Sequence, residues 1–62
     1  MLYDLYGVVN HYGSLGAGHY TAYCQNFLNK KWYEFNDSRV SEISRNDVVS
    51  ESSYVLFYRR KD

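Results

Sequence analysis

The sequence contains one cysteine and no proline in 62 residues. A single cysteine, Cys24, excludes an internal disulfide and any zinc site built from several cysteines. No apolar run approaches the roughly 20 residues that a membrane-spanning helix needs, and the first residues do not have the pattern of a signal peptide, so we expect neither feature. The formal net charge is zero, so nothing points to nucleic acid or to an anionic membrane. We therefore expect no metal, cofactor, nucleic acid or membrane as a partner, and the unpaired cysteine favours an intracellular setting, cytoplasmic or nuclear.

Aromatic side chains are abundant: eight tyrosines, three phenylalanines and one tryptophan. Such residues favour strands over helices. A domain of this length buries only about 60% of the surface of its unfolded chain, so its core is marginal. Small domains usually compensate with disulfides or metals, and this chain offers neither. We expect a strand-rich part of a larger domain, with Met1 marking where a fragment or gene model begins.

The alternation of apolar and polar residues predicts several strands and one short helix. The strands are expected at residues 2–9, 20–25, 31–35 and 53–59. A glycine-rich loop, two turns and a solvated tail are expected at residues 11–18, 26–30, 36–39 and 59–61. Ser44 is a suitable N-cap for a helix that runs through Val49. The last strand is apolar on both faces, which predicts a central position in the sheet.

The hairpin between the second and third expected strands brings a histidine towards a polar pair. A four-residue loop places His19 opposite Asn36, and a three-residue loop places it opposite Asp37. Directly opposite residues lie about 4.5–5.5 Å apart at Cβ. Either register therefore brings the imidazole within reach of a side-chain oxygen, and the local sequence does not choose between them.

His19 has the surroundings that a general base needs. Such a base directs one ring nitrogen at a nucleophile while an acceptor, either an amide oxygen or a carboxylate, holds the other. The residues alone leave open whether His19 is a base or merely satisfies the end of a strand. His11 is expected to be a loop histidine bonded to backbone. Cys24 alternates to the face opposite His19 and is expected to be a buried structural thiol.

The glycine-rich loop suggests where a substrate would lie. Small residues allow the backbone to approach a ligand closely, and an aromatic side chain beside them completes a narrow slot for an extended peptide of small residues. The candidates for substrate contact are Gly16, Ala17, Gly18 and Tyr20.

Three segments together resemble the ubiquitin-specific proteases, the largest group of cysteine deubiquitinases. They are NHYGSLGAGHYTAY, KWYEFNDSRV and SYVLFYRR, and the resemblance extends from Tyr3 to Arg59. It implies an α+β, papain-like cysteine protease fold, of which residues 1–62 form the C-terminal, mainly antiparallel β part.

The resemblance also implies a role for each candidate residue. His19 would be the general base that activates a cysteine, Asn36 would orient its imidazole, and Asp37 would support that pair or replace Asn36. The reaction would be hydrolysis of the isopeptide or peptide bond after the C-terminal glycine of ubiquitin, with the loop at residues 11–18 and Tyr20 near that tail. The family often has aspartate where this chain has Asn36, and asparagine is also accepted there.

The cysteine box of the family lies upstream of anything present in this sequence. So do its oxyanion-stabilising asparagine and the structural zinc site found in many members. The resemblance therefore implies that the full domain is the enzyme, with ubiquitin or a ubiquitinated protein and the upstream part of the domain as partners. The 62-residue chain alone is expected to be inactive and poorly soluble or unstable. The alternative is a catalytically inactive ubiquitin-binding or scaffold module of the same fold.

Overall fold

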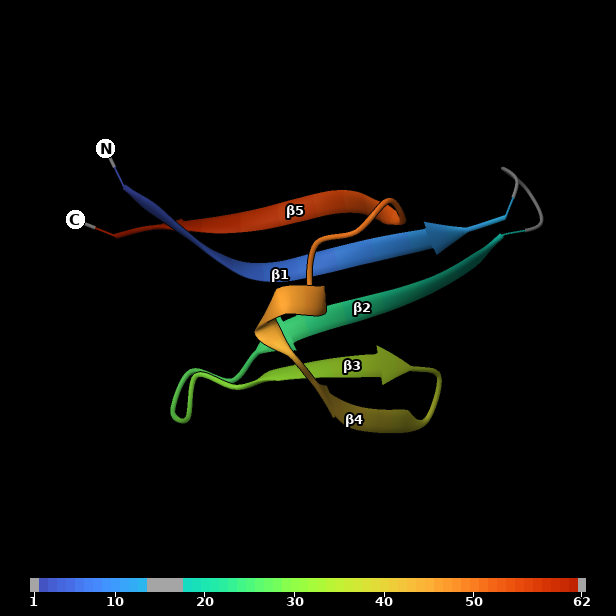
Figure 1. Ribbon diagram of the computed structural model, residues 1–62, viewed down its shortest axis with the longest axis horizontal. Coiled ribbons are helices and arrows are strands. Elements are labelled where there is room, and N and C mark those ends of the chain that lie inside the picture. The colour runs from blue at the N-terminus through green and yellow to red at the C-terminus, as the bar shows by residue number, and fades with distance from the viewer. Residues whose placement is uncertain (1, 14–17, 62) are drawn as a thin grey trace.

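The computed structural model describes residues 2–13 and 18–61. In this part of the chain, five antiparallel strands form one sheet with the order β4-β3-β2-β1-β5 (Figure 1). The strands are β1 (Tyr3–Tyr12), β2 (His19–Gln25), β3 (Trp32–Asn36), β4 (Arg39–Ile43) and β5 (Ser53–Arg60). One 3₁₀ helix, η1 (Arg45–Asp47), lies between β4 and β5. The prediction of a mainly antiparallel β structure is confirmed, and the described residues contain no α-helix.

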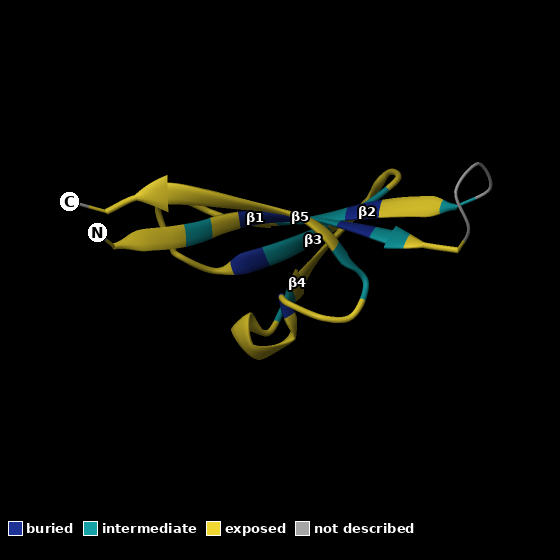
Figure 2. Cartoon of the chain, turned by 90° about the horizontal axis from the view of Figure 1, so that it is seen from above, coloured by how far each residue is buried: buried dark blue, intermediate teal, exposed yellow. Residues whose placement is uncertain are grey.

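The segment around η1 covers one face of the sheet (Figure 2). Ser44 caps this helix as predicted, because its Oγ accepts a hydrogen bond from the Asn46 backbone N–H at 3.2 Å. The helix ends at Asp47 and is therefore shorter than expected. The core consists of Val8, Trp32 and Val48, with Leu5, Tyr23 and Ile43 packed against it. We call the side of the sheet that carries Val8, Thr21 and Trp32 the covered face.

The opposite side, which we call the open face, carries Ala22, Cys24 and Phe35. Large apolar side chains are exposed on it: Phe35 and Phe57 are each 42% exposed. The radius of gyration is 12.3 Å, whereas a compact chain of this length would have roughly 10.5 Å. The described chain is therefore a single sheet with a core on one side (Figure 2). Within this part of the chain, no helix has the length and apolar character required to cross a membrane.

Two strands differ from the predicted pattern. β1 continues to Tyr12, so His11 lies in a strand instead of a loop, with its backbone N–H bonded to the Ser52 carbonyl at 3.0 Å. β4 was not predicted, because its residues are mostly polar and exposed. It forms because residues 37–38 make a tight turn that returns the chain alongside β3, where Asn36 pairs with Arg39.

β5 is an edge strand of this sheet, so its predicted central position is wrong. It pairs with β1 and extends to Arg60, which places Arg59 and Arg60 in the strand instead of a solvated tail. Its apolar pattern indicates burial on two sides, but the described residues leave the strand exposed along most of its length. Cys24 is likewise exposed and not buried, because it lies on the open face.

The hairpin between β2 and β3 has neither predicted register. Gln25 pairs with Trp32 and Ala22 with Phe35, so residues 26–31 form the connection. Asn26 organises this longer turn: its Oδ1 accepts hydrogen bonds from the backbone N–H groups of Leu28 and Asn29 at 2.9 and 3.2 Å. Relative to the four-residue loop the pairing shifts by two residues, and an even shift keeps every side chain on its predicted face.

Candidate active site

His19 and Asn36 meet on the covered face, at the end of the sheet where β1 leads into β2. His19 is the first residue of β2 and Asn36 the last residue of β3. Continuing the observed register by one pair sets Thr21 opposite Asn36, so His19 lies diagonally across from Asn36. Diagonal neighbours remain within reach of long side chains. His19 Nε2 lies 3.0 Å from Asn36 Oδ1.

This hydrogen bond determines which ring nitrogen can accept a proton. An amide oxygen only accepts hydrogen bonds, so Nε2 of His19 carries the hydrogen that it donates to Asn36 Oδ1. In the neutral imidazole, Nδ1 is then unprotonated and free to act as a base. His19 is exposed and Asn36 is half-buried, so the imidazole is open to another molecule while the Asn36 side chain is held in the sheet.

Asp37 occupies a different position from Asn36. It lies in the turn between β3 and β4, is exposed, and has a φ of 54°. Aspartate adopts this left-handed conformation more readily than most residues. The side-chain hydrogen bond that the structure gives His19 goes to Asn36. The structure therefore brings Asn36, and not Asp37, to the imidazole.

Gly18 is the described member of the small-residue candidates, since Gly16 and Ala17 lie outside the described residues. A Cβ atom at Gly18 would overlap His11 Nε2 and lie 2.7 Å from the Tyr12 carbonyl oxygen. A residue with a side chain would therefore push β1 and β2 apart directly before His19. Glycine at this position allows the close approach of the two strands.

Tyr20 belongs to a cluster of three rings on the open face. Its ring centroid lies 4.7 Å from that of His11 and 6.3 Å from that of Tyr54. His11 and Tyr54 are 5.7 Å apart, so the His11 ring packs against aromatics, where we had expected a bond to backbone. The sequence alone does not reveal Tyr54 as a member, because its position depends on the long-range pairing of β1 with β5. Tyr20 and His19 point to opposite faces of the same strand end.

A buried polar pair lies beside the His19–Asn36 contact and was not predicted. Asn10 is 0% exposed and Thr21 is 5% exposed. Asn10 Nδ2 donates a hydrogen bond to Thr21 Oγ1 at 3.2 Å. The signal in the sequence was a polar residue directly after Val8 and Val9 in a strand.

Two tyrosines lie on the same face. Burial, together with a hydrogen bond to Tyr12, raises the pKa of Tyr23 to about 12. Tyr12 pairs directly with His19 in the sheet. Within residues 2–13 and 18–61, no three or more His, Cys, Asp or Glu side chains are grouped so as to hold a metal ion.

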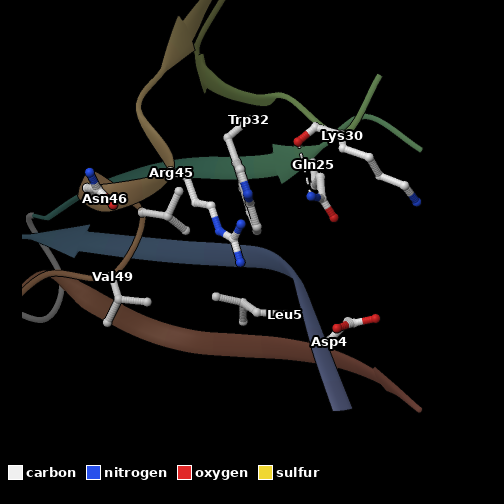
Figure 3. Close-up of a pocket in the computed structure, with 9 residues that line it drawn as sticks. Asp4, Leu5, Gln25, Lys30, Trp32, Arg45, Asn46 and Val49 are labelled. Carbon is white, nitrogen blue, oxygen red and sulfur yellow. Dashed lines mark hydrogen bonds between the residues drawn. The ribbon is translucent and has the colours of Figure 1, made fainter. Parts of the chain in front are cut away.

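A hollow of about 480 Å³ lies on the covered face, away from these residues. Trp32 and Leu5 form its apolar wall, and Arg45, Lys30 and Asp4 bring charges of both signs to it (Figure 3). None of the predicted site residues lines it. The candidate site is therefore an exposed strand end and not this hollow.

Comparisons with known proteins point to one protein family. Residues 1–58 match the family described as ubiquitin carboxyl-terminal hydrolase. Ubiquitin carboxyl-terminal hydrolase 4 of Pongo abelii is 57% identical over 61 residues, which cover 98% of this chain and 6% of the relative. The SAGA DUB module containing Ubp8, Sgf11, Sgf73 and Sus1 includes a chain that superposes with a TM-score of 0.88 at 43% identity, covering 97% of this chain and 14% of that one. In a structure of this module bound to monoubiquitin, the matching chain superposes with a TM-score of 0.83 at 44% identity, again covering 97% of this chain and 14% of that one.

Proposed function

This chain belongs to the ubiquitin carboxyl-terminal hydrolase family, and we propose that it is the C-terminal part of a papain-like cysteine protease domain that cleaves ubiquitin from proteins. It spans about 6% of the length of the curated relative that it matches. The nucleophilic cysteine and most of the ubiquitin-binding surface would come from the upstream part of such a domain. In this proposal the chain supplies the general base and the residue that orients it.

The hydrogen bond between His19 Nε2 and Asn36 Oδ1 carries this proposal. It leaves Nδ1 as the basic nitrogen on an exposed ring at the beginning of a strand. A Cys-His-Asn arrangement of this kind occurs in papain-like proteases. The exposed Cys24 does not fit the role of nucleophile, because it lies on the opposite face of β2 and five residues from His19.

The residues imply the following sequence of proton transfers. His19 Nδ1 removes the proton from the thiol of the upstream cysteine, and the thiolate attacks the carbonyl carbon of the terminal glycine of ubiquitin. Asn36 Oδ1 holds the imidazolium in place by accepting from Nε2–H. The imidazolium then protonates the departing amine, which leaves a thioester. Water attacks this thioester with His19 again as the base, and the free carboxylate and thiol are released.

The residues next to His19 support contact with the ubiquitin tail. Gly18 lets β1 and β2 approach closely directly before His19, and Tyr20 offers an aromatic surface on the opposite face of the same strand end, within the cluster that it forms with His11 and Tyr54. An extended Gly-Gly tail requires a narrow approach that is free of side chains. A solved chain that is 44% identical to this one belongs to a module bound to monoubiquitin, which also supports ubiquitin as the partner.

A chimera tests this function. In the catalytic domain of the Pongo abelii relative, the matching 61-residue segment is replaced by the corresponding residues of this chain. The chimera should cleave a fluorogenic ubiquitin amide and react with an electrophilic ubiquitin probe. His19→Ala should reduce both reactions by about 100-fold or more, because general acid–base catalysis contributes about 10²–10⁴-fold.

Lys31→Ala is the control, since Lys31 is exposed in the connection between β2 and β3, at the other end of β2 from His19. It should leave both rates unchanged. Wild-type probe labelling that persists in the His19→Ala variant would contradict the mechanism and would favour the inactive ubiquitin-binding or scaffold module. The isolated 62-residue chain should cleave nothing.

A further inference from the structure

We propose that the hollow beside Trp32 binds an acidic side chain of a peptide segment from another protein, together with an apolar residue next to that side chain. The hollow holds about 480 Å³, within the roughly 300–1,000 Å³ of ligand pockets. His19 and Asn36 are not among its lining residues, so the inference goes beyond the proposed function.

Two hydrogen-bond donors without partners line this hollow. Trp32 is 5% exposed, and its indole N–H donates to no acceptor in the described part of the chain. A buried indole N–H usually has a partner. Arg45 likewise makes no ion pair among residues 2–13 and 18–61, and Figure 3 shows its side chain extended into the hollow between Trp32 and Leu5. The ligand that fits here therefore brings acceptor oxygens.

The charges around the hollow favour an anion. Arg45 and Lys30 line it, and Asp4 is the acidic residue of its wall. Asp4 Oδ1 lies 4.0 Å from Lys61 Nζ, which offsets its charge. A guanidinium pairs with the two oxygens of a carboxylate, and the indole N–H of Trp32 supplies a further donor. A carboxylate fits better than a phosphate, because Asp4 repels a doubly charged group more strongly than a singly charged one.

The rest of the wall fits a polypeptide. Leu5 and Val48 provide apolar surface for a neighbouring side chain. Gln25 Nε2 donates to the Lys30 carbonyl at 3.1 Å, which leaves Gln25 Oε1 as an acceptor for a backbone N–H of the peptide. Val49 also lines the hollow and is 56% exposed. The hollow therefore opens to the surface, where a segment of another molecule can enter.

Two capped peptides test this inference. The chain contains one tryptophan, so its fluorescence reports on the hollow. We expect acetyl-Leu-Glu-Leu-amide, added at millimolar concentration, to change this fluorescence with saturation. Acetyl-Leu-Gln-Leu-amide keeps the shape and lacks the charge, and it should bind about tenfold more weakly, because hydrogen bonds between charged groups are the stronger ones. Calorimetric titration of the chimera should give the same ratio.

Arg45→Gln and Arg39→Gln form a matched pair of variants. Arg39 is exposed on β4 and does not line the hollow. Arg45→Gln should weaken binding of the glutamate peptide about tenfold, to the level of the glutamine peptide. Arg39→Gln should leave the affinity unchanged. If Arg45→Gln does not fold, the comparison of the two peptides on the wild type decides, and if the isolated chain does not fold, the chimera decides.

Several outcomes would overturn the inference. They are equal binding of the two peptides, equal losses in the two arginine variants, and no saturable binding of the glutamate peptide. Binding to the isolated chain but not to the chimera would show that another part of the domain occupies the hollow, which also overturns it. The proposed function is tested separately, since Arg45→Gln should leave cleavage by the chimera unchanged and His19→Ala should leave peptide binding unchanged.

Discussion

The two faces of the sheet differ in how much of their environment this chain supplies. On the covered face, Val8 and Trp32 are 1% and 5% exposed beneath the segment that carries η1. On the open face, Phe35 and Phe57 remain 42% exposed although they are as apolar. The candidate base and its orienting residue lie on the covered face, and the aromatic cluster around Tyr20 lies on the open one.

The difference between the two faces shows that the geometry of the candidate site and the stability of the chain have different origins. The contact of His19 with Asn36 is set by neighbouring strands within the chain. The open face instead leaves large apolar side chains exposed, and exposed apolar surface of this kind marks an interaction or aggregation site. The chain can therefore form the contact between His19 and Asn36 while the apolar side chains of its open face remain exposed.

The largest effect should come from removing the main aromatic side chain of the core. Trp32→Ala in the isolated chain should cost about 3–5 kcal/mol, comparable with the whole free energy of unfolding of a domain of this length, roughly 3–9 kcal/mol. Phe35→Ala, on the same strand β3 but on the open face, should cost less than about 1 kcal/mol. Urea unfolding followed by circular dichroism measures both. Equal losses would show that the two faces are equally packed.

Asn36 and Asp37 provide the next comparison, between the covered face and the exposed turn. In the chimera, Asn36→Ala should lower kcat by about 10²-fold, because the imidazole loses the acceptor that fixes its tautomer. Asp37→Ala should change kcat by less than about threefold, since loss of an exposed group away from the hydrogen bond is expected to cost within roughly 0.5 kcal/mol. Steady-state cleavage of a fluorogenic ubiquitin amide measures this. A larger loss for Asp37→Ala would make the turn residue the true orienter.

A smaller effect should appear at alkaline pH through Tyr23. Burial and its bond to Tyr12 raise the pKa of Tyr23 to about 12 in the folded chain, above the value of about 10 in an unfolded chain. The folded state thus holds this proton more tightly, and the resulting stability is present below pH 10 and lost as the pH rises towards 12. Because the side chain is half-buried, we expect the loss to be about 1 kcal/mol after solvent screening. The free energy of unfolding of the wild type should fall more between pH 9 and pH 11.5 than that of the Tyr23→Phe variant. Equal falls in the two proteins would contradict the raised pKa of Tyr23.

The smallest effect on stability should come from polar substitutions on the open face. Val55→Ser with Phe57→Ser should change the free energy of unfolding of the isolated chain by less than about 1 kcal/mol while reducing its self-association. Sedimentation velocity measures the association. The same pair in the chimera should lower the melting temperature, because there the face would be covered. No change in the chimera would mean that nothing packs on this face.

The sequence predicted the structural features that depend on the pattern of neighbouring residues. The β2 and β3 strands, the cap at Ser44 and the meeting of His19 with the Asn36-Asp37 pair follow from alternation, glycine placement and strand ends. The choice of Asn36 over Asp37 did not follow from local residues, because the hairpin connection is longer than the two that we considered. Its length depends on the side chain of Asn26, which bonds two backbone N–H groups.

The features that were missed depend on contacts between distant segments. Tyr54 approaches Tyr20 only because β5 pairs with β1. β5 was expected to be central because its sequence resembles a strand buried on both sides, although the described residues cover neither side fully. β4 was missed because its polar residues gain their structure from pairing with β3 and not from their own burial.

The position of the two chain ends sets a minimum length for any segment that delivers a nucleophile. The Lys61 backbone N–H donates to the Leu2 carbonyl at 2.9 Å, and both ends lie at the end of the sheet away from the start of β2 (Figure 1). β1 has 10 residues, which span roughly 33 Å at the rise of an extended strand. Polypeptide joined before Leu2 must travel back over this distance to reach His19. If the proposed thiol partner lies in polypeptide joined before Leu2, at least about ten extended residues, or about 22 helical residues, would separate it from Leu2.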